Sequence, residues 1–396
     1  MDRRSFLASG ALASGIPLLG ALAPAQAASG RAGTAAIDRV DLRSDGLGLQ
    51  PAEYAALLHQ LTRDPAFEAD DYSLGGNLEK LEQAFARRLG KPAAIYLPTG
   101  TLANHLAVRA LAGHATGHAT GNGSRVLLQA DSHLYNDSGD GTTVLSGLNL
   151  VPLRADDESA TLPLEAVRAE VERAAGGRVP LRVGAISLES PVRRLGHRYV
   201  PWEAVRALSD YARGEGIGLH LDGARLFNLP QHTGHGVREY AALFDTVYVS
   251  LWKHFNAASG AILAGESALI EPLRPQRRMF GSGLPHAWPL AVPALSYLDD
   301  YEAQYARAWQ AADAVIALLR ADGRLRVQAL PQGTSSVLLY LPEGVDGAAW
   351  SQRAAARGVR VGAPPPGGNA MLQVNATLLR RSPPAVTKVL LDALQG

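Results

Sequence analysis

Cysteine is entirely absent from this chain of 396 residues. Its absence excludes disulfide bonds, thiolate metal sites and cysteine nucleophiles. A charge imbalance is absent too, because 38 Lys and Arg residues are matched by 37 Asp and Glu residues and the net charge is +1. This balance does not suggest a partner such as nucleic acid or a membrane surface. The 47% of hydrophobic and 19% of charged residues are typical of a globular protein.

Long apolar runs are missing beyond the N-terminus, so we expect no membrane span in the mature chain. Residues 1–27 have the pattern of a targeting segment, with an apolar run broken by glycines and a small-x-small cleavage site at Ala25-Gln26-Ala27. Arg3-Arg4 before Phe6-Leu7 resembles a twin-arginine signal, although Asp2 stands where Ser or Thr is usual. We therefore expect a bacterial protein that is periplasmic or secreted; an ordinary secretory signal or an N-terminal anchor is the alternative.

Short apolar runs alternate with helical patterns from about residue 90 onward. The strands that we expect are 93–97, 125–128, 183–188, 218–222, 246–250 and 260–264. Helical patterns between them include 101–112 and 202–214. Continuous apolar runs separated by helices favour an α/β fold whose mostly parallel sheet is covered on both faces.

The pattern changes after Pro293. A long helix over 294–321 is expected there, followed by a strand over 335–341 and by helices over 348–357 and 384–394. These elements predict a small C-terminal α+β domain. The expected organisation is a signal peptide over 1–27, a large domain over 28–293 and the small domain over 294–396.

Polar residues follow several expected strands at their carboxyl ends, the edge where open α/β sheets bind ligands. Thr99-Gly100-Thr101 joins a strand to a helix, and the free N–H groups of a helix start favour an anion such as phosphate. A plain helix-capping turn is the alternative. His133 follows the strand that ends near Gln129, where its ring could lie over a cofactor and move protons. A capping or core histidine is the alternative.

Two further strand ends carry charge. Asp222 would need a cationic partner, which a protonated pyridine nitrogen would provide, and Arg225 could hold an anionic oxygen. An internal Asp222–Arg225 ion pair is the alternative reading. Lys253 lies between a buried strand and an apolar Trp-Phe environment, where burial would lower its pKa and free its amine to form an imine. The alternative is a lysine that reaches solvent at the sheet edge.

The order of these features resembles a fold-type I enzyme that uses pyridoxal 5'-phosphate (PLP). Five blocks, taken in order, resemble the threonine aldolase group of the β-eliminating lyases: 41–45, 97–104, 187–189, 219–228 and 250–253. The resemblance runs over roughly 41–283. It implies a PLP-dependent lyase that cleaves a β-hydroxy-α-amino acid by a retro-aldol reaction to glycine and an aldehyde.

Residue roles follow from this resemblance. Lys253 would hold PLP as a Schiff base, Asp222 would pair with the pyridine nitrogen, and His133 would stack on the ring. Thr99, Gly100 and Thr101 would hold the phosphate.

The resemblance also assigns substrate contacts. Arg225 would lie near the phenolate oxygen and the substrate carboxylate, which Ser44 would also touch. Tyr72 matches a tyrosine that in this family reaches the site of a neighbouring subunit, so a homodimer or homotetramer is implied.

Three departures from the family pattern concern the substrate side. The family's Lys-Gly-Leu-Gly is Lys253-His254-Phe255-Asn256 here. The segment 189–194 lacks the family's histidine; His197 lies nearby, but the sequence gives no reason to assign it that role. The segment 369–374 lacks the family's carboxylate-binding arginine, for which Arg360 and Arg193 are substitutes only by guess. We therefore expect intact cofactor binding and a substrate that need not be threonine.

Two alternatives stay open. One is a PLP-dependent β-eliminating lyase that releases a keto acid and ammonia, and the other is an exported binding protein that keeps the fold without turnover. A metal-dependent hydrolase is disfavoured because the sequence has no clustered His, Asp and Glu ligand set. A dinucleotide-binding enzyme is disfavoured because no Gly-x-Gly-x-x-Gly turn follows the first strand.

Overall fold

The computed structural model describes residues 38–116, 124–157 and 159–395, so the proposed signal segment lies outside the described residues. The strands are β1 (Val40–Asp41), β2 (Ala93–Leu97), β3 (Arg125–Gln129), β4 (Asn149–Leu153), β5 (Val183–Glu189), β6 (Gly218–Asp222), β7 (Thr246–Ser250), β8 (Ala261–Gly265), β9 (Arg326–Ala329), β10 (Ser336–Tyr340), β11 (Val359–Arg360) and β12 (Asn369–Gln373). Longer helices are α2 (Pro51–Thr62), α3 (Gly76–Leu89), α4 (Gly100–Thr116), α7 (Leu164–Ala175), α8 (Trp202–Gly214), α16 (Tyr301–Asp322), α17 (Gly347–Ala356) and α18 (Pro383–Asp392).

Short helical segments fill many of the connections. The short α-helices are α5 (His133–Asn136), α6 (Gly141–Ser146), α9 (Leu229–Thr233), α10 (Val237–Ala242), α11 (Leu251–Phe255), α12 (Ser267–Ile270), α13 (Leu273–Met279), α14 (Trp288–Ala291) and α15 (Leu295–Leu298). Single 3-10 turns are η1 (Arg193–Leu195), η2 (Leu226–Asn228), η3 (Val292–Ala294) and η4 (Ala376–Arg380).

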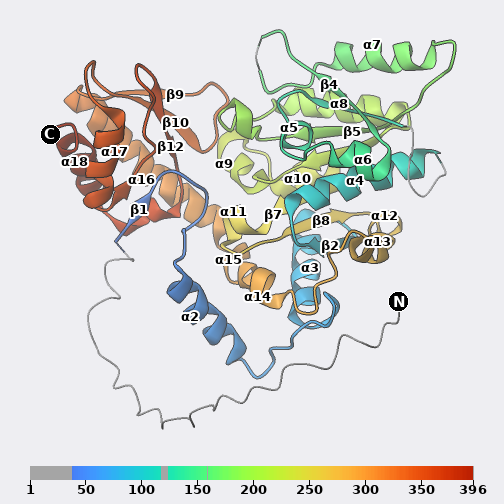
Figure 1. Cartoon of the computed structure of the whole chain (residues 1–396), viewed down its shortest axis with the longest axis horizontal. Coiled ribbons are helices and arrows are strands. Elements are labelled where there is room, and N and C mark those ends of the chain that lie inside the picture. The colour runs from blue at the N-terminus through green and yellow to red at the C-terminus, as the bar shows by residue number, and fades with distance from the viewer. Residues whose placement is uncertain (1–37, 117–123, 158, 396) are drawn as a thin grey trace, which may run out of the picture. The chain divides into compact units, whose positions relative to one another are not determined.

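A seven-stranded sheet has the order β2-β8-β7-β6-β5-β3-β4 (Figure 1). The strands from β7 to β4 pair in parallel, whereas β8 runs antiparallel to both of its neighbours. The strands alternate their side chains between two apolar layers, since Tyr96 belongs to one buried cluster and its neighbours Ile95 and Leu97 belong to another. The chain therefore has the mostly parallel sheet, covered on both faces, that the sequence predicted.

Helices pack against both apolar faces of the seven-stranded sheet. Helix α4 contacts β5, β6, β7 and β8 on one face, and α3 and α8 contact the sheet from the other layer. Helix α8 is amphipathic and buries Val205, Leu208 and Ala212 toward the sheet. The carboxyl ends of β5, β6 and β7 consequently meet at one edge, next to the start of α4.

A second apolar cluster lies in the C-terminal part of the chain, built around the sheet β12-β10-β9 and helices α16 to α18 (Figure 1). It includes Val40 and Leu42, because β1 pairs in parallel with β11 from the other end of the chain. The segment after β1 thus leaves the C-terminal cluster and leads toward the larger sheet.

Some sequence expectations were wrong in detail. The helix expected over 294–321 is interrupted, because α15 ends at Leu298 and α16 begins at Tyr301. Asp299 and Asp300 separate them, and aspartate competes with the helical backbone for hydrogen bonds.

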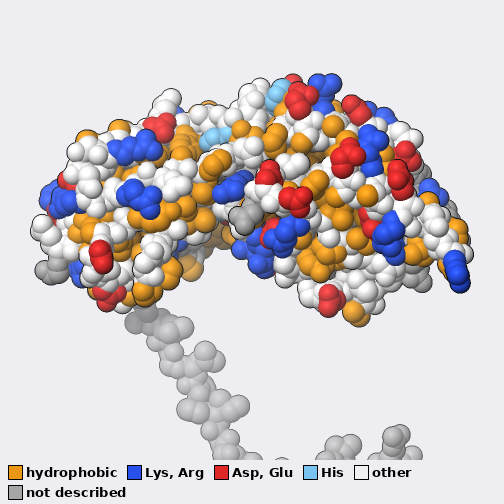
Figure 2. Space-filling model, turned by 90° about the horizontal axis from the view of Figure 1, so that it is seen from above, with side chains coloured by type: hydrophobic (Ala, Val, Ile, Leu, Met, Phe, Trp, Pro, Cys, Tyr) orange, Lys and Arg blue, Asp and Glu red, His pale blue; other side chains and the backbone are white. Residues whose placement is uncertain are grey.

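None of the helices within the described ranges combines the length and hydropathy needed to cross a bilayer. On the face seen in Figure 2, acidic and basic side chains are interspersed instead of gathering in patches of one sign.

Candidate active site

Lys253 lies in α11, the short helix that begins directly after β7. Its side chain is buried, and burial together with the charge of Arg225 lowers the pKa of its amine to about 8, against the opposing pull of Asp222. With a pKa of about 8, roughly one lysine in ten has a free amine at pH 7, far more than for an ordinary lysine, and that amine can attack an aldehyde. The structure thus buries this amine directly after a strand, in the surroundings that the sequence predicted.

Asp222 ends β6 and is buried beside this amine. Its carboxylate accepts hydrogen bonds from the side-chain nitrogen of Asn104 at 2.5 Å and from the backbone nitrogen of Ala224 at 3.2 Å. Within the described part of the chain, no ion pair links Asp222 to a basic side chain. A buried carboxylate without a cation is costly, so the site suits a ligand with a positively charged nitrogen.

Gly100 begins α4 and permits a very close approach by Tyr248. A Cβ atom on Gly100 would lie only 1.9 Å from the Tyr248 hydroxyl oxygen. Thr99 accepts a hydrogen bond from the backbone nitrogen of Leu102 at 3.2 Å and so caps the helix. The N–H groups of Gly100 and Thr101 belong to the first turn of this 17-residue helix, which provides an anion site of the kind that phosphates occupy.

His133 begins α5, and Glu189 fixes its position. The Glu189 carboxylate accepts the backbone N–H of His133 at 2.6 Å and the backbone N–H of Arg193 at 2.9 Å. Burial lowers the pKa of His133, while the charge of Asp222 opposes that shift. Nitrogen Nδ1 of His133 is buried and has no hydrogen-bond partner among the described residues. The ring is therefore a neutral imidazole next to the carboxylate and the amine.

Glu189 is a site residue that sequence reasoning did not single out for a role. Burial and the neighbouring charge of Asp222 raise its pKa to about 7. It is the last residue of β5 and pairs in register with Asp222 on β6. The rule that selected Asp222, a polar residue at the end of a buried strand, would have selected Glu189 as well.

Arg225 forms a buried ion pair with Asp45, a different partner from the Asp222 of the internal-pair interpretation. Its Nε and Nη2 donate to the two carboxylate oxygens of Asp45 at 3.0 Å and 2.7 Å. Burial alone would raise the pKa of Asp45, yet Arg225 holds it well below its usual range. The guanidinium is thus neutralised and oriented by the segment that follows β1.

Neutral polar groups lie near this ion pair. His197 bonds through Nδ1 to the Ser336 hydroxyl at 2.6 Å, while its buried Nε2 has no partner in the part of the chain that the structure describes. Burial and the charge of Arg225 lower its pKa to about 3. The Oε1 of Gln373 is likewise buried without a partner, and Gln373 lies directly opposite Ser336 in the β10–β12 ladder. Both side chains therefore have unused hydrogen-bonding capacity on the same side of that ladder.

His254 follows Lys253 and is also neutral. Its ring stacks on Tyr301 with centroids 4.6 Å apart, and within the described ranges neither ring nitrogen has a hydrogen-bond partner. Burial lowers its pKa to about 3. The departure from the family motif therefore adds a buried aromatic layer behind the lysine.

The structure also shows the surroundings of the four other candidate residues. Ser44 lines a cavity of about 530 Å³ together with Asp45 and Trp252. Tyr72 is 46% exposed, beneath the Arg278 guanidinium at 4.9 Å. The two guessed substitutes have other partners: Arg193 pairs with Asp137 at 2.7 Å, and Arg360 lies 3.7 Å from Asp41.

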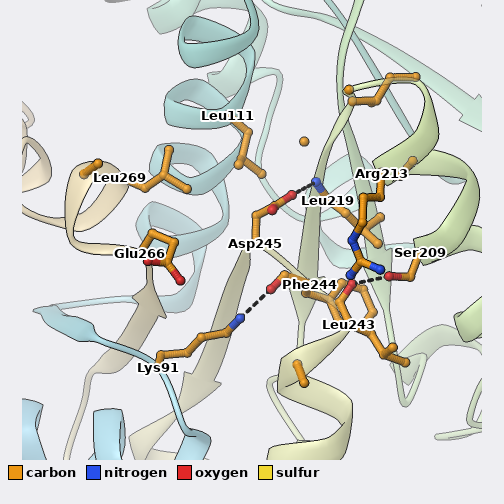
Figure 3. Close-up of a pocket in the computed structure, with 16 residues that line it drawn as sticks. Lys91, Leu111, Ser209, Arg213, Leu219, Leu243, Phe244, Asp245, Glu266 and Leu269 are labelled. Atoms are coloured by element: carbon orange, nitrogen blue, oxygen red, sulfur yellow. Dashed lines mark hydrogen bonds between the residues drawn. The ribbon is translucent and has the colours of Figure 1, made fainter.

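A cavity of about 620 Å³ lies at the opposite edge of the sheet (Figure 3). In this cavity Lys91 donates to the Phe244 carbonyl at 2.6 Å, and Asp245 accepts from the Leu219 backbone at 2.7 Å. These residues adjoin the amino ends of β6 and β7. The cavity beside Lys91 is therefore remote from Lys253 and is not the site described above.

The free amine of Lys253 and the uncompensated carboxylate of Asp222 fit the aldehyde and the pyridine nitrogen of PLP, while the start of α4 fits its phosphate. The fold is that of the fold-type I PLP-dependent enzymes. Within this class, the profile of the beta-eliminating lyase family matches residues 41–341, and the chain belongs to that family.

Individual relatives agree with this placement. An Arabidopsis thaliana protein named "Probable low-specificity L-threonine aldolase 2" is 28% identical over 309 residues, which cover 78% of this chain and 83% of the relative. Low-specificity L-threonine aldolase 1 of the same plant is 29% identical, but the match covers 59% of this chain and only 63% of the relative. The solved threonine aldolase of Leishmania major has a TM-score of 0.68 at 16% identity, over 89% of this chain and 98% of that one, and shows the shared fold.

Proposed function

We propose that the protein cleaves a threonine-like β-hydroxy-α-amino acid between Cα and Cβ, giving glycine and an aldehyde, with PLP held on Lys253. The observation that carries the proposal is the pairing of a buried amine, whose pKa burial lowers to about 8, with the buried carboxylate of Asp222, which forms no ion pair among the described residues. Membership of the beta-eliminating lyase family and the threonine aldolases among its relatives support the same reaction.

Bound PLP supplies an electron-accepting ring that is conjugated to the substrate α-carbon. Asp222 accepts two N–H hydrogen bonds and would accept a third from the pyridine nitrogen. Cleavage of the Cα–Cβ bond to an aldehyde and glycine would require a base that takes the proton of the β-hydroxyl group and an acid that returns a proton to Cα. His133 is a neutral imidazole beside Asp222 and can accept that proton, whereas His197 is a much weaker base because burial and the charge of Arg225 lower its pKa to about 3.

The substrate side favours a ligand that does not depend on a free cation. Arg225 is already paired with Asp45, whereas His197 and Gln373 offer uncharged hydrogen-bonding atoms. We therefore propose that the best substrate is a β-hydroxy amino acid other than threonine.

The test is a panel of β-hydroxy amino acids that varies the β-substituent and both stereocentres, with glycine and aldehyde measured together. Equal amounts of the two products from at least one substrate are expected. A purified protein that binds PLP and releases neither product would refute the aldolase reaction. Keto acid and ammonia in their place would establish the β-elimination alternative.

A matched pair of lysine variants ties the reaction to the site. Lys253→Ala is expected to lose covalent PLP and turnover. Lys91→Ala removes another largely buried lysine, at the opposite edge of the sheet, and should keep both. Equal loss in the two variants would show a general effect on folding.

We also propose that the protein forms a homo-oligomer. Four large side chains are exposed near the start of α3 or near the lysine: Tyr72, Leu74, Trp252 and Met279. Exposed apolar groups of this size favour contact with a second copy. Sedimentation at micromolar concentration should give a dimer or tetramer, and Tyr72→Ala should lower activity without unfolding the chain if the residue reaches a neighbouring site.

Export by the twin-arginine route is a separate proposal, and Arg3 and Arg4 lie outside the described residues. That route carries folded proteins, which suits a chain that acquires its cofactor before transport. Replacing both arginines with lysine should abolish export and retain the protein in the cytoplasm. Unchanged export would refute the proposal.

A further inference from the structure

A chain of buried hydrogen bonds leads from the middle of the large sheet to Asp222. The Thr246 hydroxyl lies 2.9 Å from Nδ1 of His220, and Nε2 of His220 lies 2.9 Å from Oδ1 of Asn104. Asn104 in turn donates from Nδ2 to Asp222. The side chains of Thr246, His220 and Asn104 are fully buried, so water does not compete for these bonds.

The carboxylate at the end of this series of hydrogen bonds determines which atom is the donor in each of them. Asp222 can only accept, so the NH₂ group of Asn104 must point at it and the Asn104 oxygen must face His220. Nε2 of His220 therefore carries the ring proton. Burial lowers the pKa of His220 to about 4, which leaves its Nδ1 unprotonated and able to accept from the Thr246 hydroxyl.

The strands and α4 put these groups in line. His220 and Asp222 are two residues apart on β6 and so share a face, and Thr246 is the register partner of His220 on β7. Asn104 lies one helical turn after Gly100 on α4. The same helix therefore offers its first N–H groups to an anion and, one turn later, an amide to Asp222.

We propose that Asn104, held in place by His220 and Thr246, is a positioning residue that fixes the Asp222 carboxylate against the pyridine nitrogen of PLP. The proposal rests on the proposed function in that it requires PLP at this site. Without Asn104 the carboxylate keeps only the 3.2 Å hydrogen bond from Ala224 and is free to rotate. A carboxylate that rotates away stabilises the protonated pyridine nitrogen less.

The experiment loads the full-length protein with ¹⁵N-labelled PLP and follows the pyridine nitrogen resonance against pH, alongside PLP affinity from equilibrium titration. Asn104→Ala should lower the pH at which the ring nitrogen loses its proton by about one unit and weaken PLP binding about tenfold or more, as expected for a lost hydrogen bond to a charged group. Asn228→Ala is the matched control, since Asn228 is equally buried but bonds to Tyr301. It should leave the resonance unchanged.

Thr246→Val removes the hydroxyl that bonds to His220, at the end of the hydrogen-bond series farthest from Asp222, and keeps the shape of the side chain. It should shift the resonance in the same direction as Asn104→Ala, by a smaller amount, and it decides the matter if Asn104→Ala does not fold. If Asn104→Ala folds and its PLP ring nitrogen titrates as in the wild-type protein, the proposal is overturned. If Asn104→Ala does not fold, a wild-type titration in Thr246→Val overturns it. Failure of the wild-type protein to bind PLP would instead refute the proposed function.

Discussion

Asp45→Asn should destabilise the protein strongly, because Asp45 and Arg225 form an ion pair that is almost sealed from water. The two side chains are 9% and 5% exposed and share two hydrogen bonds of 2.7 Å and 3.0 Å. Asparagine keeps one acceptor, loses the charge and turns an NH₂ group toward the guanidinium. Removing one partner of a buried pair typically costs about 3–5 kcal/mol, since the other charge is left unpaired.

The expected loss can be measured as a melting temperature of the cofactor-free protein. An unfolding entropy of about 2.1 cal/mol/K per residue, over roughly 360 residues of the compact unit, converts about 3–5 kcal/mol into a decrease of about 4–7 °C. Asp392→Asn is a control, because it breaks an exposed bond to Lys388 and should leave the melting temperature nearly unchanged.

A double-mutant cycle separates the ion pair from simple loss of packing. Arg225→Met alone leaves Asp45 as the unpaired charge, whereas Asp45→Asn combined with Arg225→Met leaves no charge. The double variant should therefore be more stable than the sum of the single effects predicts. Strict additivity, or a loss below about 1 kcal/mol for Asp45→Asn, would show that the pair is screened and would refute the reasoning.

Three more predictions concern the cofactor pocket. The rate at which PLP attaches to the apo-protein should rise with pH with a midpoint near pH 8, because burial lowers the pKa of Lys253 from 10.5 to about 8, and stopped-flow absorbance would measure it. Between these two pKa values the unfolded chain binds one more proton than the folded chain. The free energy of unfolding, measured by urea titration, should therefore rise with pH across that interval. Gly100→Ala should destabilise the protein by about 1–3 kcal/mol and weaken PLP binding because its Cβ meets Tyr248, whereas Gly141→Ala projects into open space and should be silent in both titrations. His133→Phe should keep PLP affinity but lower kcat, and an unchanged kcat would exclude His133 as the base.

The sequence allowed the sheet to be predicted largely because its strands are continuous apolar runs. β2, β6 and β7 have the predicted boundaries. β4 escaped prediction because it is an edge strand, only partly buried and interrupted by Pro152. β1 and β11 have two residues each, too few to display a period.

Some residues of the candidate site could be predicted from the sequence, and others could not. Lys253 and Asp222 could be proposed from the sequence because a single local rule, polar residues at strand ends, selects them. Asn104 could not be found, since a buried amide within a helix gains its meaning from a strand 118 residues away. The partner of Arg225 was equally hidden, because Asp45 precedes it by 180 residues and only the tertiary fold brings them together.

The pairing of β1 with β11 has a consequence for assembly on the ribosome. Val40 and Leu42 are among the first described residues to be synthesised, yet their packing partners are at 308 and beyond. The segment that carries Asp45 must therefore wait, without its final contacts, until nearly the whole chain has emerged. A chain cut short before β11 would contain every strand of the large sheet and both Asp45 and Arg225, and would still lack the anchor that brings these two residues together.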